Sequence, residues 1–296
     1  MSSVDLCIYW KPNIGCPIYL LEQTAMSITL EIDRKSRLAG VPISVNGESG
    51  FIFTLDSGAI ATTLGLEAAE RLGLEVYSEP RTAPAFAGGL PAKYTTIGVL
   101  RIGSLDFKDE EVLVMDLSRM RRGNVRAGVL GHSMLKTCVM LLDYASRSLI
   151  LTRDSEEAHD IDWSDFKYVE DSHLVTLPTR VNGSKPYDFV LDTGAGSTVV
   201  TPKLAEALGL DVQSVHGIAR GLAGDTELKM TTIQELSVNQ LNLHDVRAAV
   251  IDLGHVSPRG SSIEYGILGV NFLSQCGFAI DYPRRKYGLE SRPPSE

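Results

Sequence analysis

The sequence contains one pattern twice, in the same order and at a fixed distance. Residues 53–59 read Phe-Thr-Leu-Asp-Ser-Gly-Ala, and residues 189–195 read Phe-Val-Leu-Asp-Thr-Gly-Ala. The two aspartates, Asp56 and Asp192, are therefore 136 positions apart. A single Asp-Ser/Thr-Gly sequence is a common turn. Two copies in register, each preceded by Phe-x-Leu and followed by Ala, indicate two matched loops whose carboxylates meet in the folded protein.

The repeat extends well beyond these loops. Residues 69–76 match residues 205–212 at the same offset, and residues 128–131 match residues 266–269 at an offset of 138. Such a long period excludes a solenoid, whose repeats have about 20–50 residues. The 296 residues also correspond to two domains of about 150 residues each. We conclude that the chain consists of two copies of one domain, with a two-residue length difference in a single loop.

The duplication predicts the domain boundaries. The first copy occupies residues 26–152 and the second occupies residues 173–292, and each is long enough to bury its own core. Between them, residues 153–172 hold many acidic and few apolar side chains, which is typical of an exposed linker. Residues 1–25 form an N-terminal extension without a counterpart in the second copy, and residues 293–296 form a tail.

Short β-type segments separated by turn residues dominate both copies. Asn46-Gly47 and Asn182-Gly183 are strong signals for two-residue hairpin turns. Each copy also predicts a short helix, at residues 66–72 and 202–208, closed in each case by a glycine. Many short strands with one or two short helices per copy predict closed, barrel-like sheets. The predicted strands are residues 27–32, 41–45, 50–55, 95–102, 107–115, 139–142 and 148–151, then 228–238, 243–251, 278–281 and 286–289.

The chemistry of the motif is that of a carboxylate pair. A glycine two residues after each aspartate lets the backbone turn sharply and approach a neighbouring chain. The hydroxyl of Ser57 or Thr193 can hydrogen-bond across to the other copy. Two carboxylates about 3 Å apart cannot both ionise, so the pair holds one proton and can share a water molecule. Such a pair can act as a base toward the water and as an acid toward a leaving amine, as peptide-bond hydrolysis requires.

These features resemble the retropepsin-like aspartic proteases, in a tandem, single-chain form. The resemblance covers both copies. It implies an all-β fold of two tandem retropepsin-like β-barrel domains related by pseudo-twofold symmetry, each with one or two short helices. It also implies that Asp56 and Asp192 are catalytic and that the substrate binds as an extended strand under two flaps.

The resemblance assigns further residues by position. Those that support the catalytic loops are Ser57, Gly58, Ala59, Thr193, Gly194 and Ala195. Those of the hydrophobic-hydrophobic-Gly motif behind each loop are Val129, Leu130, Gly131, Ile267, Leu268 and Gly269. Those of the substrate-binding flaps are Phe86, Ala87, Gly88, Gly89, Leu222, Ala223, Gly224 and Asp225. Turn geometry alone is the alternative explanation of the flap glycines.

The chain departs from the retroviral pattern at two pairs of positions. Ile60 and Gly196 stand where the retroviral enzymes usually carry an Asp. His132 and Val270 stand where they usually carry an Arg. In the family this acid and base form an ion pair that supports the dimer. The absence of both partners is consistent, because the loss of only one would leave the other charge buried without a partner. The acid also touches the substrate backbone in the family, so substrate register and specificity stay open.

The sequence therefore predicts an aspartic endopeptidase whose two halves form one active site, with a groove that favours apolar side chains beside the scissile bond. Ala59 and Ala195 offer no hydroxyl to stabilise the ionised pair, which favours a working pH of about 5–6 rather than about 2–3. Two alternatives stay open. In one, the same fold is a catalytically silent module that binds peptides as an adaptor. In the other, each half pairs with a half of a second chain in a homodimer.

The composition of the chain indicates which kinds of molecule it binds. The formal net charge of −9 argues against nucleic acid, whose phosphates bind basic surfaces. The basic cluster within residues 119–126 is interpreted as part of a solvated loop. No apolar run reaches the roughly 18–20 residues of a membrane span, and the N-terminus lacks a signal-peptide pattern. We expect a polypeptide substrate, no membrane association, a cytoplasmic location and a monomer whose halves form an internal pseudo-dimer.

The remaining reactive residues predict neither a metal nor a cofactor. The four cysteines lack metal-ligand spacing. Cys138 and Cys276 occupy equivalent positions of the repeat and are expected to be buried thiols. The histidines show no ligand spacing either. His132-Ser133 is rejected as a nucleophile–base pair, because such groups must meet in space rather than in sequence.

Overall fold

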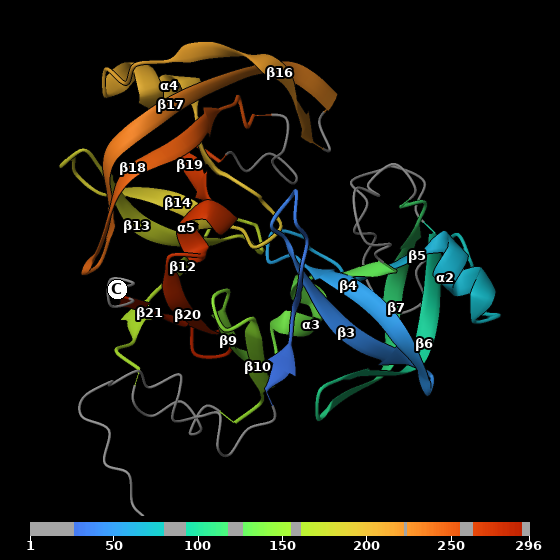
Figure 1. Ribbon diagram of the computed structural model, residues 1–296. Helices are drawn as coiled ribbons and strands as arrows, with labels where there is room; N and C mark the ends of the chain where they lie inside the picture. Colours follow the sequence, from blue (N-terminus) through green and yellow to red (C-terminus); the bar gives the residue numbers. More distant parts are fainter. Residues whose placement is uncertain are drawn as a thin grey trace, which may run out of the picture.

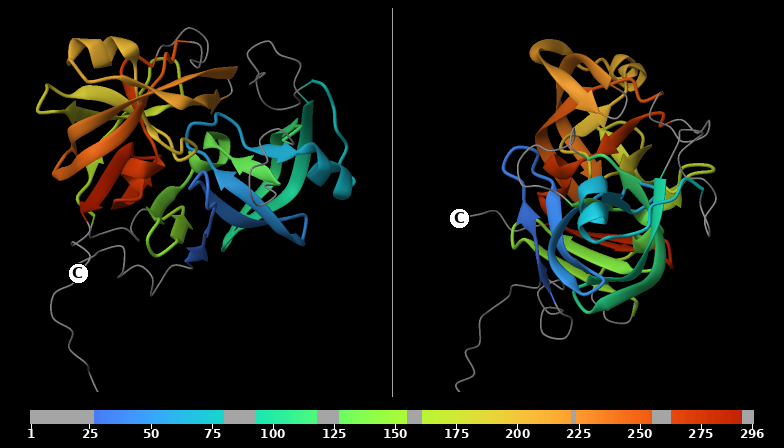
Figure 2. Two further views of the ribbon diagram at one scale, coloured as in Figure 1. Left: turned by 45° about the horizontal axis from the view of Figure 1, so that its top comes forward. Right: turned by 90° about the vertical axis from the view of Figure 1, so that its right-hand side faces the viewer.

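The structure is a computed structural model, and it describes residues 27–79, 93–117, 127–154, 161–221, 224–254 and 263–291 of the chain. Figures 1 and 2 show two β lobes joined by a third sheet. The helices of the described segments are short, with six residues at most. This architecture confirms the predicted all-β fold with few short helices.

The N-terminal half contains a closed barrel of six strands. Their order is β3-β4-β8-β5-β7-β6, and a further pairing of β3 with β6 closes the sheet. A short strand, β2 (Glu31–Ile32), extends it beside β3. The barrel strands are β3 (Ala39–Val45), β4 (Glu48–Leu55), β5 (Thr63–Gly65), β6 (Lys93–Ile102), β7 (Leu105–Met115) and β8 (Gly128–Leu130). The helices of this half are α2 (Leu66–Arg71) and α3 (His132–Leu135).

The C-terminal half repeats this barrel strand for strand. Its order is β13-β14-β19-β15-β18-β17, closed by a pairing of β13 with β17. Two edge strands, β12 (Lys167–Tyr168) and β16 (Gln213–Gly221), extend the sheet. The barrel strands are β13 (Val175–Val181), β14 (Tyr187–Leu191), β15 (Thr198–Val200), β17 (Gly224–Val238), β18 (Leu241–Val250) and β19 (Gly266–Leu268). The helices are α4 (Pro202–Ala207) and α5 (Val270–Leu273).

A third sheet combines strands of both halves. Its order is β1-β10-β9-β20-β21-β11, and the two halves meet where β9 pairs antiparallel with β20. Every residue of β9 and β20 is buried, so these apolar strands are covered on both faces. The halves are therefore continuous through a sheet. The strands are β1 (Ile28–Thr29), β9 (Val139–Asp143), β10 (Ser148–Thr152), β11 (Ser164–Asp165), β20 (Cys276–Asp281) and β21 (Lys286–Ser291).

Local sequence explains the matched turns of the two barrels. Asn46 and Gly47 have φ angles of 51° and 86°, and Asn182 and Gly183 have φ angles of 49° and 71°. Two consecutive positive φ angles define the hairpin turn that Asn-Gly favours. Each turn sets the register of the strand that leads to an aspartate, so the repeated Asn-Gly positions both acids in the same way.

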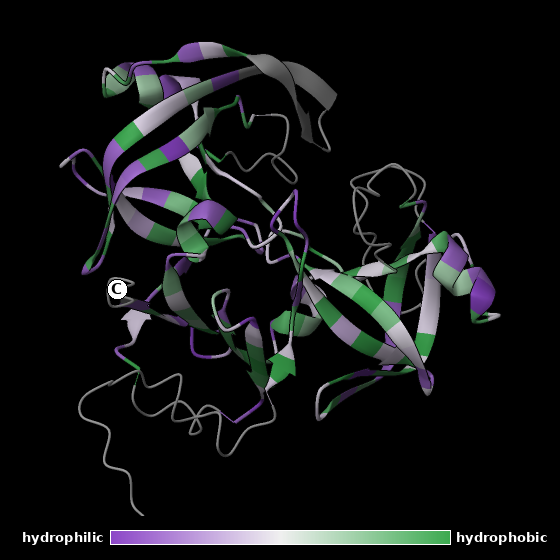
Figure 3. Cartoon of the chain, in the orientation of Figure 1, coloured by the Kyte–Doolittle hydropathy of each residue, from purple (hydrophilic) through white to green (hydrophobic). Residues whose placement is uncertain are grey.

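The core follows the alternation of residues along the strands. Figure 3 shows hydrophobic and hydrophilic residues alternating along β3 and β4, and the inward residues of both barrels belong to one continuous apolar cluster. Phe53 and Phe189 of the repeated motif are fully buried in it. A Cβ at Gly128 would lie 2.6 Å from the Phe53 ring, and a Cβ at Gly266 would collide with Phe189. Each ring therefore packs against the strand behind its catalytic loop.

Phe53→Ala should lower the free energy of unfolding by about 3–5 kcal/mol, because it removes a fully buried ring and leaves a cavity that the barrel cannot close. Urea denaturation followed by circular dichroism measures the change. Val212→Ala is the control, since Val212 is 39% exposed and its truncation should change the unfolding free energy little. Equal losses in the two variants would contradict the structural role of the ring.

Candidate active site

The two predicted catalytic loops lie at the junction of the barrels. The first follows β4 and the second follows β14. Each preceding strand runs parallel to a hydrophobic-hydrophobic-Gly strand, β4 beside β8 and β14 beside β19. Asp56 N–H donates to Leu130 O, and Asp192 N–H donates to Leu268 O, both at 3.1 Å. The strand behind each loop thus holds the backbone of its aspartate.

The hydroxyl groups of Ser57 and Thr193 connect the two loops. Ser57 N–H donates to Thr193 Oγ1 at 2.9 Å, and Thr193 N–H donates to Ser57 Oγ at 3.0 Å. Each hydroxyl then donates to the other half, Ser57 Oγ to Leu191 O and Thr193 Oγ1 to Leu55 O, both at 3.1 Å. Both side chains are buried. This reciprocal network is formed within one chain.

The carboxyl groups of Asp56 and Asp192 lie within hydrogen-bonding reach of each other. Ala59 N–H donates to Asp56 Oδ1 at 2.9 Å, and Gly194 N–H donates to Asp192 Oδ1 at 2.7 Å. Each glycine of the motif also packs against the acid of the other half. A Cβ at Gly58 would lie 2.8 Å from the Asp192 carboxyl, and a Cβ at Gly194 would collide with that of Asp56. Only glycine allows this approach.

The environment of the pair favours a shared proton. Burial, and then the charge of Asp192, raise the pKa of Asp56 to about 8. Burial also raises the pKa of Asp192, against the opposing effect of hydrogen bonds from Gly194 and others. Two carboxyls this close titrate as a unit, so a wide pH range exists in which the pair carries one proton and one negative charge.

The raised pKa of Asp56 predicts a pH dependence of stability. A carboxyl whose pKa is higher in the folded state stabilises the fold fully below its unfolded pKa, and this stabilisation is lost as the pH rises through the folded value of about 8. Asp56→Asn removes that titration. The melting temperature of the variant minus that of the wild type should therefore rise between pH 4 and pH 8.5. Scanning calorimetry at constant ionic strength measures both curves, and parallel curves would contradict the assignment.

Two histidines contact the backbone of the first catalytic loop, although the sequence showed no role for them. His173 is 9% exposed, and its Nε2 lies 2.8 Å from Gly58 O. Because a carbonyl only accepts, Nε2 carries the proton of neutral His173. His132 begins α3, and its backbone N–H donates to Ala59 O at 2.8 Å. The centroids of the two rings are 5.4 Å apart, so they form one cluster beside the loop.

The C-terminal half has the same backbone contact without the imidazole. Val270 N–H donates to Ala195 O at 2.8 Å, as His132 N–H does to Ala59 O. The mismatch of His132 and Val270 inside a closely matching segment was the one sequence signal that could have singled out His132. Nothing in the sequence paired it with His173, because the two residues come from different halves.

The predicted flaps are described only in part. The first, with Phe86, Ala87, Gly88 and Gly89, lies outside the described residues, as do Leu222 and Ala223 of the second. The basic cluster of residues 119–126 lies outside them too. Gly224 and Asp225 begin β17, where they pair with Gly221 and Arg220 of β16. The β16–β17 hairpin extends toward the N-terminal half (Figure 1).

The described segments contain no group of three or more His, Cys, Asp or Glu that could hold a metal ion. Cys138 and Cys276 are buried and free. None of the described helices has the length and apolar character needed to cross a membrane.

Two barrels that repeat each other strand for strand, with one acid from each at their junction, define the fold of an aspartic protease. Of the solved structures, 402 chains match. Among them is the aspartic proteinase from Irpex lacteus, which is 15% identical, covers 90% of this chain and 97% of its own, and aligns with a TM-score of 0.51. At this identity the likeness concerns the fold.

Residues 41–134 and 177–272 each match the model of the aspartyl protease family, one match in each half. The chain belongs to the aspartyl protease family. A comparison with curated protein sequences returned no match. Family and fold together support aspartic protease activity, and therefore peptide hydrolysis, in general terms.

Proposed function

We propose that the protein is an aspartic endopeptidase in which Asp56 and Asp192 form the catalytic pair. The observation that carries this proposal is the reciprocal packing of the two loops. Each carboxyl rests against the glycine of the other half, and the Ser57–Thr193 network holds both loops together. Bringing two acids together destabilises the fold at neutral pH. A turn with only a structural role does not require this arrangement, so the pair favours a catalytic role.

In the proposed reaction, the ionised carboxyl of the pair takes a proton from a water molecule held between the two acids. The protonated carboxyl donates its proton to the carbonyl oxygen of the scissile bond. As these protons move, the water oxygen forms a bond to the carbonyl carbon, which gives a tetrahedral gem-diol intermediate. The intermediate collapses when the carboxyl that took the water proton passes it to the amide nitrogen and the C–N bond breaks. The other carboxylate takes back a proton from a hydroxyl as the carbonyl forms again, so the pair again holds one proton. Because the pair supplies one base and one acid, the raised pKa of Asp56 extends the pH range in which both are present.

The proposed substrate is an extended peptide that lies across the pair under two flaps. The β16–β17 hairpin supports the position of the second flap, since it is long and paired to its last described residues, Gly221 and Gly224. Within this hairpin, the register in which β16 pairs with β17 shifts between Ser214 and Ile218. Extended peptides bind such β structures through backbone hydrogen bonds, whereas side-chain pockets select the sequence. The proposed groove favours apolar side chains beside the scissile bond.

The test is digestion of a peptide library by the purified protein between pH 3 and pH 9.5, with and without pepstatin. We expect cleavage that pepstatin blocks and that weakens as the pH rises above the upper pKa of the pair. Peptide binding without cleavage would favour the silent adaptor module instead.

Light scattering distinguishes the intrachain active site from a homodimer. The hydrogen bonds between Ser57 and Thr193 support an active site completed within one chain. We therefore expect the active species to have the monomer mass of 32.2 kDa. Activity confined to a species of twice this mass would favour the homodimer.

A further inference from the structure

A pocket of about 530 Å³ lies between the two halves, next to the first catalytic loop. It is lined by both ends of α3, by three residues of the segment that follows β11, and by the turn that follows β20. The residues are His132, Lys136, Thr137, Tyr168, Ser172, His173, Tyr282, Pro283 and Arg285. His173 connects it to the loop through the hydrogen bond to Gly58 O. Neither Asp56 nor Asp192 lines the pocket, which contacts the backbone of the first catalytic loop through His173.

The buried floor of the pocket carries polar atoms that lack partners. Tyr282 is 3% exposed, and its hydroxyl has no hydrogen-bond partner among the described residues. The same holds for Nδ1 of His132. Buried hydroxyl and imidazole groups normally have partners, because an unsatisfied one costs about 1–3 kcal/mol. An unpartnered buried polar atom at the edge of a pocket indicates a position where a bound group can complete its hydrogen bonds.

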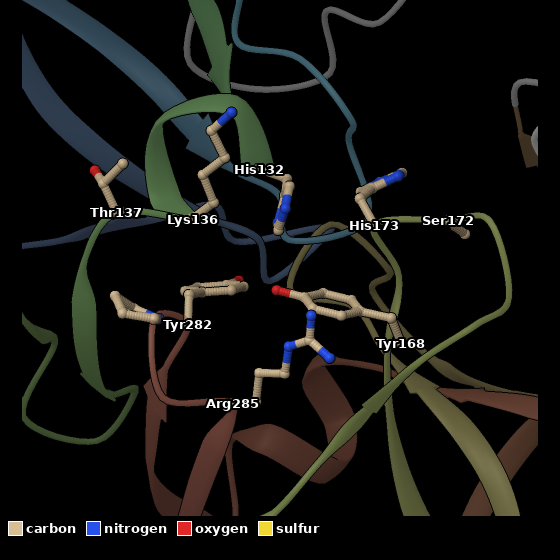
Figure 4. A pocket seen from close by; sticks show the side chains of 9 residues that line it. His132, Lys136, Thr137, Tyr168, Ser172, His173, Tyr282 and Arg285 are labelled. Atoms are coloured by element: carbon tan, nitrogen blue, oxygen red, sulfur yellow. The ribbon is translucent and has the colours of Figure 1, made fainter.

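The polar residues that line the pocket are mostly hydrogen-bond donors, and two of them, Lys136 and Arg285, are cations. In Figure 4, the hydroxyls of Tyr168 and Tyr282 point toward each other, with His132 on one side and the guanidinium of Arg285 on the other. Arg285 lies over the Tyr168 ring, 5.4 Å from its centroid. No carboxylate lines the pocket, and no described acid forms an ion pair with Arg285 within salt-bridge distance.

We propose that this pocket is a binding site for a small oxyanion, a phosphate or a carboxylate, held by Arg285 and by the hydroxyls of Tyr168 and Tyr282, with His132 beneath it. An arginine guanidinium matches the two oxygens of such a group. The tyrosine hydroxyls then donate to a charged acceptor, which is a stronger interaction than a hydrogen bond to water.

Proton binding is coupled to anion binding at this site. Burial, and then His173 and Lys136, lower the pKa of His132 to about 4, and burial lowers the pKa of His173. His132 also faces Tyr168 and Tyr282 edge-on, and Tyr282 is close enough to Asp56 and Asp192 to be influenced by their charge. A bound anion opposes the effects that disfavour the imidazolium, so it raises the pKa of His132. By linkage, the anion binds more tightly as the pH falls.

The proposal is tested by calorimetric titration of the full-length protein with phosphate and, separately, with succinate, at pH 6.5 and constant ionic strength set with chloride. Saturable binding of either ion supports the site. The ion that binds with the lower Kd indicates whether the site prefers a phosphate or a carboxylate. We expect Arg285→Gln to weaken binding by at least about tenfold and Tyr282→Phe by at least about fivefold, because each removes a donor to a charged acceptor.

Arg284→Gln is the matched control. Arg284 is the adjacent arginine of the same turn, is largely exposed and does not line the pocket. Equal affinities of the Arg284 and Arg285 variants, or no saturable binding of either ion, would overturn the proposal. The readout is binding, so it is independent of whether the protein cleaves peptides.

Sulfate tests the proton linkage, because its own charge is constant between pH 5 and pH 7.5. Because the anion raises the pKa of His132 from its lowered value of about 4, sulfate should bind at least about threefold more tightly at pH 5 than at pH 7.5. His132→Asn should abolish this difference while the wild type and Arg284→Gln keep it. The same pH dependence in His132→Asn would overturn the role of this histidine.

Discussion

Asp192→Asn should lower kcat for peptide cleavage by at least about 10³-fold, because the pair then lacks either its base or its acid. The substitution keeps the size of the side chain, and the amide oxygen can still accept the hydrogen bond from Gly194 N–H. We therefore expect KM and the melting temperature at pH 5 to change little. Initial rates on a peptide selected from the library, measured from pH 3.5 to pH 8, give kcat and KM.

Asp188→Asn is the control for this experiment. Asp188 lies on β14, the strand that leads to Asp192, but its side chain is exposed. Its variant should retain the wild-type rate. Asp56→Asn should match Asp192→Asn, and the double variant should be no slower than either, since residues that act as a unit are not additive. Undiminished cleavage by either single variant would exclude the carboxylate pair as the catalytic group.

Gly194→Ala should lower kcat/KM by at least about 10²-fold, the scale expected when a catalytic group is displaced by about 1 Å. The added methyl group collides with the Asp56 carboxyl, although the residue comes from the other half. Asp56 must then move away from Asp192, so the two carboxyls no longer share a proton. We therefore expect a shift of the lower pH limit of activity, below which neither acid is ionised to act as the base.

The control for crowding is Gly98→Ala. Gly98 is exposed on β6, and an added Cβ there would approach only the side-chain oxygen of Asn46, at 3.2 Å. We expect unchanged kinetics for this variant. Circular dichroism of both proteins shows whether the fold persists. A fully active Gly194→Ala variant would mean that the two loops are farther apart in solution than in the structure.

The duplicated motif predicted most of what positions the site. Local patterns were sufficient for the longer strands of the first half, for the Asn-Gly turns and for the helices α2 and α4, because these follow from alternation, turn chemistry and capping. In the second half they were sufficient for β17, β18, β20 and β21. The helices α3 and α5 were missed because four residues, such as those from His132 to Leu135, are too few to show a helical period. The strands β13, β14 and β16 were not among the predicted strands. The pairing of β16 with β17 is irregular between Ser214 and Ile218.

Contacts between the halves were beyond the reach of sequence reasoning. The apolar segments β9 and β20 were predicted as strands, but an apolar run does not reveal which strand lies beside it. Their mutual pairing therefore appeared only in the structure. The contact of His173 with Gly58 could not be predicted either, because the sequence does not show which residues of different halves lie side by side. The reciprocal contact of the two loops could be inferred because the repeat itself implied a twofold relation.

The pairing of β9 with β20 has a consequence for self-digestion. A cut between the halves would leave the chain held together by this sheet, because β20 covers the full length of β9. If the fragments did separate, the first would expose β9 as an apolar edge with free N–H and C=O groups, which is a template for aggregation. Autolysis would thus yield either a nicked but intact molecule or an insoluble piece, and not a free soluble half.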